Sequence, residues 1–143
     1  MLSVSLERVN EKNLVDMLFL REDSRAAARV FLGRLKGRKG RLTKAEMSGF
    51  ARDLASGRLG VRLSRTNFYR TILSNFMDLG LVAEDLVYDQ DAMKVIRAYR
   101  AVVQPVSGQK PASPSLIYLA HVIAARWNDE MFGPEIPADG EAK

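Results

Sequence analysis

Apolar residues recur at intervals of three or four positions in five parts of the chain. These parts are 5–20, 24–36, 43–56, 64–79 and 115–132. That spacing places apolar side chains on one side of an α-helix, where they can face a core. The pattern therefore predicts a mainly α-helical protein, in which the second helix is capped by Asp23 or Ser24 and ends near Lys36.

The third of these segments has the clearest beginning. Thr43 is followed three residues later by Glu46. This is the pattern of a capping box, in which each side chain accepts a hydrogen bond from the other residue's backbone N–H. Ser56 and Gly57 are typical of a helix end. We therefore expect a helix over 43–56.

The fourth segment combines an apolar side with a distinctly polar one. Ser64 is a favourable N-cap and Gly80 a favourable stop. The predicted inner face consists of Tyr69, Ile72, Leu73, Phe76 and Leu79. The predicted outer face consists of Thr66, Asn67, Arg70, Thr71 and Ser74.

The stretches with β character are short. Residues 61–63, which follow two glycines, fit a brief extended segment. Residues 81–88 and 93–103 flank a turn at Asp89-Gln90-Asp91, and the second stretch is rich in β-branched and aromatic residues, so we predict a hairpin. The alternative is a helix beginning at Asp91, because the apolar residues of 94–103 also fit a helical face.

The chain divides into a central domain and four flanking segments. The expected parts are an N-terminal helical extension at 1–20, a domain at 21–104, a proline-containing linker at 105–114, a helix at 115–132 and a disordered tail at 133–143. A domain of this size can bury its own core.

Positive charge is concentrated in the first half of the chain. Residues 21–70 hold fourteen of the 22 lysines and arginines and four of the 17 acidic residues, a net charge of +10 against −5 for the rest. Such asymmetry favours an anionic partner, nucleic acid above all. The alternative is a basic surface that only aids solubility.

The sequence LSRTNFYRTILSNFMDLGLV, residues 63–82, resembles the recognition-helix region of winged-helix transcription regulators. The shared features are a serine cap, a polar outer face, apolar residues seven and four positions before a glycine, and Leu-Val after it. The resemblance covers about residues 22–103, with GVRL and YRAVV in the places of the first and third strands. It implies a winged helix-turn-helix fold, mainly α with a small β-hairpin and additional N- and C-terminal helices. The implied function is sequence-specific binding of double-stranded DNA as a transcriptional regulator.

In that interpretation, helix 64–79 enters the major groove and its outer face contacts bases. Arg70 is suited to guanine and Asn67 to adenine. Phosphate contacts are expected from Arg38, Lys39, Arg41, Lys44, Arg58, Arg62 and Arg65. If about five of them bind phosphate, raising salt from about 50 to 200 mM weakens binding roughly 500-fold.

The hairpin departs from the family pattern. Its turn is acidic, with Glu84 and Asp85 close by, and acids repel phosphate. The tip therefore points away from DNA or contacts a protein. This supports an alternative, a winged-helix interaction module in transcription or replication machinery. An RNA-binding module is less favoured, because Phe68 is the single aromatic residue expected beside the outer face.

Catalysis is not indicated. No phosphate-binding loop, metal-binding motif or nucleophile elbow occurs, the chain has no cysteine, and His121 fits an ordinary position on the last helix. We therefore expect no enzyme activity, cofactor or metal, and a cytoplasmic protein without a secretory signal or membrane span. A homodimer is expected through the terminal helices, with the apolar stripe of the last one in the interface, the alternative being packing within one chain. The dimerisation residues are Leu116, Leu119, Ile123 and Trp127.

Overall fold

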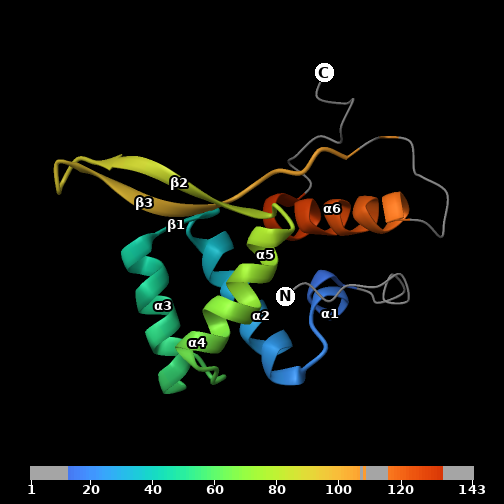
Figure 1. The fold of residues 1–143 in the computed structure, drawn as a ribbon, viewed down its shortest axis with the longest axis horizontal. Coiled ribbons are helices and arrows are strands. Elements are labelled where there is room, and N and C mark those ends of the chain that lie inside the picture. The colour runs from blue at the N-terminus through green and yellow to red at the C-terminus, as the bar shows by residue number, and fades with distance from the viewer. Residues whose placement is uncertain (1–12, 107, 109–115, 134–143) are drawn as a thin grey trace.

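The computed structural model describes residues 13–106, 108 and 116–133. It is mainly helical, with a three-stranded antiparallel sheet (Figure 1). The elements are α1 (Leu14–Leu18), α2 (Glu22–Gly37), β1 (Arg41–Thr43), α3 (Lys44–Ser56), α4 (Arg65–Asn67), the π-helical segment η2 (Phe68–Leu73), α5 (Ser74–Asp78), β2 (Val82–Asp89), β3 (Lys94–Ala101) and α6 (Leu116–Phe132). The first part of the predicted N-terminal helix, most of the linker and the tail beyond 133 lie outside the described residues. Within them, no helix is both long and apolar enough to cross a membrane.

The predicted beginnings of two helices are confirmed. Thr43 Oγ1 accepts from the Glu46 N–H at 3.1 Å, and Glu46 Oε1 accepts from the Thr43 N–H at 2.8 Å. Ser64 Oγ accepts from the Asn67 N–H at 3.1 Å. The α3 helix ends, as expected, at Gly57, whose φ of 85° is in the left-handed region that glycine adopts readily.

The predicted cap of α2 is wrong. The helix begins at Glu22, after Arg21, and no side chain caps it. Ser24 is buried inside the first turn. The acidic residues Glu22 and Asp23 instead lie in that turn, where negative charge favours the positive end of the helix dipole.

The capping box gives a first testable expectation. We expect Thr43→Ala to lower the free energy of unfolding by about 1 kcal/mol, because the Glu46 N–H loses its acceptor. Urea denaturation would measure the change. Thr66→Ala is the matched control, since Thr66 is exposed and caps no helix. Equal losses in both variants would contradict the expectation.

The predicted hairpin is confirmed, and the alternative helix from Asp91 is wrong. β2 pairs antiparallel with β3 from Val82↔Ala101 to Asp89↔Lys94. The third strand was misplaced: β1 at Arg41–Thr43, not 61–63, joins the sheet, in the order β1-β3-β2. Residues 61–63 instead lie against the end of α3, where the Leu63 N–H donates to the Leu54 carbonyl oxygen.

The segments α4, η2 and α5 form one continuous rod, called helix 65–78 from here on. Within η2 the turn is wider, as the Ser74 N–H donates to the carbonyl oxygen of Tyr69, five residues earlier. This wider turn shifts the buried face of the helix, so that Phe68 is fully buried and Tyr69 only partly. The expectation that Phe68 lies beside the outer face is therefore wrong.

One aromatic cluster joins the elements. The Phe31 ring lies 5.7 Å from that of Phe50 and 5.4 Å from that of Phe68. The Phe76 ring lies 5.7 Å from that of Phe19, next to α1, and 5.6 Å from that of Trp127, on α6. The flanking helices α1 and α6 therefore share the core of the central segment.

This packing uses the residues expected at a dimer interface. Leu119, Ile123 and Trp127 are buried within their own chain. The Leu116 side chain lies outside the described residues. For the three described residues the structure shows packing within one chain, the alternative that the sequence left open, and it does not offer them as a free surface. Whether the protein dimerises stays a prediction.

Candidate nucleic-acid interface

Helix 65–78 is anchored on one side and open on the other. Ile72 and Phe76 are buried in the core. Of the five residues predicted to contact bases, Thr66, Asn67 and Arg70 are exposed, whereas Thr71 and Ser74 are partly buried. The exposed residues belong to the first half of the helix, so this half offers its hydroxyl, amide and guanidinium groups to solvent.

The exposed residues at the start of helix 65–78 lie next to α3. Arg65 Nη2 lies 3.4 Å from the Ser48 hydroxyl oxygen, to which it donates. Lys44 and Arg52 precede and follow Ser48 by four residues, so all three lie along one side of α3. Sequence reasoning missed Ser48 and Arg52, although their spacing from Lys44 was visible.

The seven residues predicted to contact phosphate fall into two groups, three that form an ion pair and four that do not. Arg38 pairs with Glu46; Arg41 lies 3.7 Å from Asp85 and Arg58 lies 3.9 Å from Asp53. The other four form no ion pair with a described carboxylate: Lys39, Lys44, Arg62 and Arg65. An arginine that leaves a carboxylate for a phosphate gains less than an unpaired one, so these four are the stronger candidates.

These four residues do not form a single patch. Lys39, at the turn before β1, and Lys44 lie near the beginning of α3, and the Arg65 guanidinium lies beside Ser48, one turn after Lys44. The Arg62 guanidinium lies at the other end of α3, where it donates to the Ser56 carbonyl oxygen. Figure 1 shows how far apart the two ends of α3 are. A helix of 13 residues is about 20 Å long. The major groove of DNA is about 12 Å wide. Cations at the two ends of α3 are therefore far enough apart to reach phosphates on both sides of such a groove.

The hairpin carries its charges mostly as ion pairs. Arg100 Nε lies 3.2 Å from Asp85 Oδ2, and Arg97 lies 3.5 Å from Glu84. Burial, with a smaller contribution from the Glu84 carboxylate, raises the pKa of the Tyr99 phenol. The acidic tip is well separated from α4 in Figure 1, so its charge does not oppose an anion at the start of helix 65–78.

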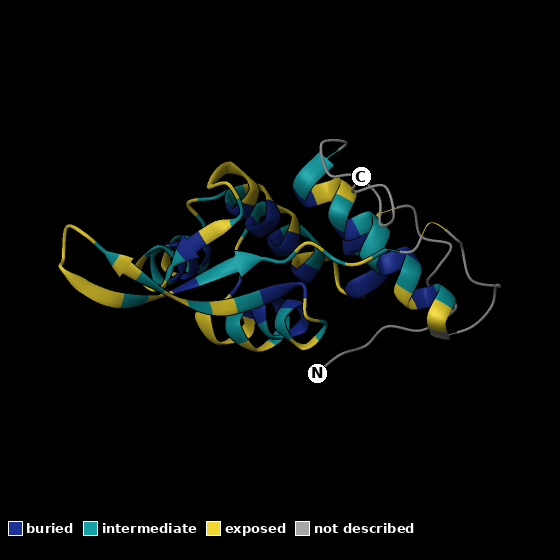
Figure 2. Cartoon of the chain, turned by 90° about the horizontal axis from the view of Figure 1, so that it is seen from above, coloured by how far each residue is buried: buried dark blue, intermediate teal, exposed yellow. Residues whose placement is uncertain are grey.

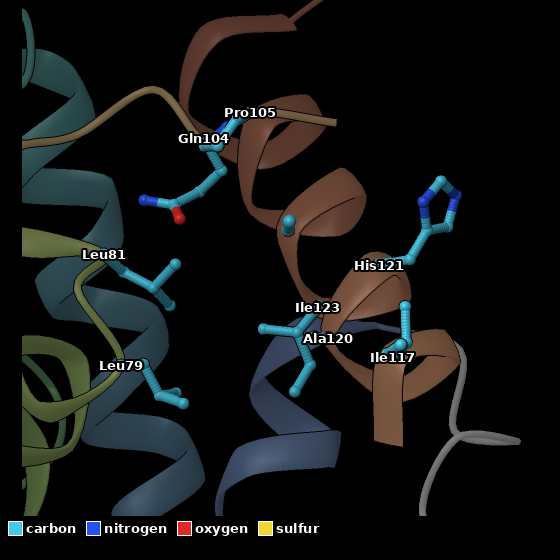
Figure 3. Close-up of a pocket in the computed structure, with 9 residues that line it drawn as sticks. Leu79, Leu81, Gln104, Pro105, Ile117, Ala120, His121 and Ile123 are labelled. Atoms are coloured by element: carbon cyan, nitrogen blue, oxygen red, sulfur yellow. The ribbon is translucent and has the colours of Figure 1, made fainter. Parts of the chain in front are cut away.

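An apolar cavity of about 360 Å³ lies between the end of α5 and α6 (Figure 3). Leu79 and Leu81 line one side and Ile123 the other. The polar Gln104 already donates through Nε2 to the carbonyl oxygens of Gly80 and Val102. His121 also lines the cavity, with its ring pointing away from the two leucines (Figure 3).

Comparison with protein-family models, with curated proteins and with solved structures finds no significant match to this chain. The functional interpretation therefore depends on the geometry of the chain itself. Among the described residues, no group of three or more histidine and acidic side chains is placed to hold a metal ion.

Proposed function

We propose that this chain is a winged-helix protein that binds double-stranded DNA in a sequence-specific way, as a cytoplasmic transcriptional regulator without catalytic activity. The order helix, strand, helix, helix, hairpin over 22–101, with the sheet order β1-β3-β2, supports the fold assignment. The sequence resemblance of residues 63–82 to recognition-helix regions supports the role of helix 65–78.

One observation carries the proposal: the first half of helix 65–78 exposes Thr66, Asn67 and Arg70 while Ile72 and Phe76 hold it to the core. A helix that enters the major groove needs such a division, because its apolar side must stay attached to the protein while its polar side meets base edges. Burial of Asn67 or Arg70 would have excluded the proposal, and both are exposed.

In this proposal, some residues of the surface contact bases and others contact phosphates. Arg70 donates two hydrogen bonds to O6 and N7 of a guanine, and Asn67 pairs with N6 and N7 of an adenine. Lys44 and Arg65 contact phosphates, as does the N-terminus of helix 65–78, whose dipole favours an anion. Phosphate contacts fix the position of the protein, and base contacts select the sequence.

The test begins with the selection of a preferred duplex from a random pool, followed by titration of that duplex and a scrambled one. We expect Arg70→Ala to reduce the preference between them by about 10- to 100-fold, because a bidentate contact to guanine contributes about 1–3 kcal/mol of discrimination. Lys44→Ala weakens binding to both duplexes equally.

Arg21→Ala is the matched control for Arg70→Ala. Arg21 is an exposed arginine that pairs with Asp23 at 3.1 Å at the start of α2, outside the proposed surface. This variant should bind like the natural protein. An Arg70→Ala protein with unchanged preference would contradict the assignment of helix 65–78, and a natural protein that binds no duplex at low salt would contradict the function.

A second candidate function is a winged-helix module that docks on another protein of the transcription or replication machinery. The observation that favours it is the hairpin, whose tip is acidic and whose outer half exposes large apolar side chains. Such a module shows no duplex binding even at low salt, so the same titration separates the two functions.

A further inference from the structure

The hairpin extends beyond the body of the protein. Its outer half lies past the helices in Figure 1, and Figure 2 shows the same protrusion from above, largely exposed. The two hairpin strands are eight residues long, but β1 pairs with β3 only at residues 98–100. Towards the tip, the hairpin is therefore a two-stranded ribbon without support from the third strand.

One face of this ribbon carries large apolar side chains, together with the ion pair of Glu84 and Arg97. Directly opposed residues in antiparallel strands share a face. Near the base this face carries the buried Val82, with Leu42 of β1 on the same side, so it is the side that faces the helices. Further out the same face carries Leu86 and the cross-strand pair Tyr88 and Val95, all exposed.

These side chains form the largest concentration of exposed apolar groups on the described surface. Seven large apolar side chains are exposed among the described residues, and four belong to the hairpin: Leu86, Tyr88, Met93 and Val95. We call these four the hairpin patch. The Tyr88 hydroxyl lies 3.9 Å from Met93 Sδ, which places the tip residue beside the face. An exposed patch of this kind on a protruding strand pair is typical of a contact with another molecule.

The charges around the patch favour a second copy of this chain. Glu84 and Arg97 lie on the same face as Leu86 and pair at 3.5 Å, so the face has no net charge. In a two-fold arrangement, the same patch meets itself and each Arg97 approaches the Glu84 of the other copy. A nucleic acid is a poor occupant, because Asp89 and Asp91 at the tip repel phosphate.

The other apolar stripe considered for a dimer, on α6, supports the same choice. The α6 stripe expected at a dimer interface is used in the core of its own chain, where Trp127 is fully buried. The tip is well separated from α4 (Figure 1), so a contact through the hairpin leaves the outer face of helix 65–78 free. We propose that the hairpin patch is the surface through which two copies of this chain form a symmetric dimer. The need for two copies rests on the proposed function, since regulators of this type read two-fold symmetric sites.

The test compares two leucines that have the same exposure. Leu86 is 67% exposed and Leu20, between α1 and α2, is 68% exposed. We expect Leu86→Lys to raise the dimer dissociation constant about 100-fold, because two leucine contacts are lost per dimer. Leu20→Lys should leave it unchanged. Sedimentation velocity of the full chain without DNA, up to high micromolar concentration, measures the dissociation constant of both variants.

Cross-linking gives an independent measurement. The chain contains no cysteine, so one introduced thiol reports one position. With a short bismaleimide, Leu86→Cys should give covalent dimers in high yield, and Leu20→Cys should give only the background of random collisions. Both positions are exposed, so neither change disturbs the core.

Three results would overturn the inference: a natural protein that stays monomeric over the whole range, a Leu86→Lys variant as dimeric as the natural protein, or equal cross-linking at positions 86 and 20. The oligomeric state is measured without DNA, so its failure is separate from that of the proposed function. A monomer that binds a selected duplex overturns the hairpin dimer alone, whereas a dimer that binds no duplex overturns the function alone.

Discussion

Replacement of Trp127 by alanine is expected to lower the free energy of unfolding by about 3–5 kcal/mol, the cost of removing a large buried aromatic side chain. Trp127 is fully buried, and its ring lies 5.6 Å from that of Phe76, on helix 65–78. The indole Nε1–H also donates to the Val102 carbonyl oxygen at 2.8 Å, which joins α6 to the segment after β3. Alanine leaves a cavity and removes this hydrogen bond, while the Val102 carbonyl oxygen keeps the one from Gln104 Nε2 at 3.1 Å.

Chemical denaturation measures this loss of stability, and two further variants help to identify its cause. Trp127→Phe keeps most of the apolar volume but loses the hydrogen bond, so its cost should be smaller than that of alanine. Ile117→Ala is the control on the same helix, because Ile117 is 70% exposed and should change stability little. A Trp127→Ala protein as stable as the natural one would show that α6 is not part of the core.

Features set by neighbouring residues could be predicted from the sequence. The capping box of Thr43 and Glu46 and the cap at Ser64 depend on residues three apart, so short-range pattern is enough to find them. The hairpin was predicted for the same reason, from two β-rich stretches around a turn. The exposed positions of Thr66, Asn67 and Arg70 follow from helical periodicity.

Features that depend on distant residues could not be predicted. The strand β1 exists because Leu42 pairs with Tyr99, 57 positions later, and is buried there. The burial of Phe68 depends on the π-helical turn and on contacts with Phe31 and Phe50, which no local periodicity contains. The α6 stripe was visible, but the partner of Trp127 was not, because an apolar stripe does not specify what it packs against.

The candidate phosphate contacts show the same limit within a single site. Sequence counts cations but does not show which of them already meet a carboxylate. Arg38 and Glu46, and Arg58 and Asp53, are close in the sequence, whereas Arg41 and Asp85 meet through the sheet. The structure therefore narrows seven candidates to four unpaired ones, and this changes the expected dependence on salt.

Duplex binding is expected to weaken about 150-fold when salt rises from about 50 to 200 mM, if the four unpaired cations each neutralise one phosphate. Each phosphate contact releases bound counterions, so the logarithm of the binding constant falls with the logarithm of salt concentration at about −0.9 per contact, or about −3.6 for four. Seven contacts would give a slope of about −6.3 and a loss of roughly 6,000-fold. Fluorescence anisotropy with a labelled duplex distinguishes these values readily.

Two single variants identify which cations contribute. Lys44→Ala should reduce the slope by about 0.9, because it removes one contact. Arg58→Ala should leave the slope unchanged, because Arg58 is held by Asp53 at 3.9 Å. A natural protein with a slope near zero would mean that the cations are an ordinary solvated surface. A slope near −6 that becomes shallower in both variants would mean that DNA draws the paired arginines away from their carboxylates. The binding surface would then include more than four phosphate contacts.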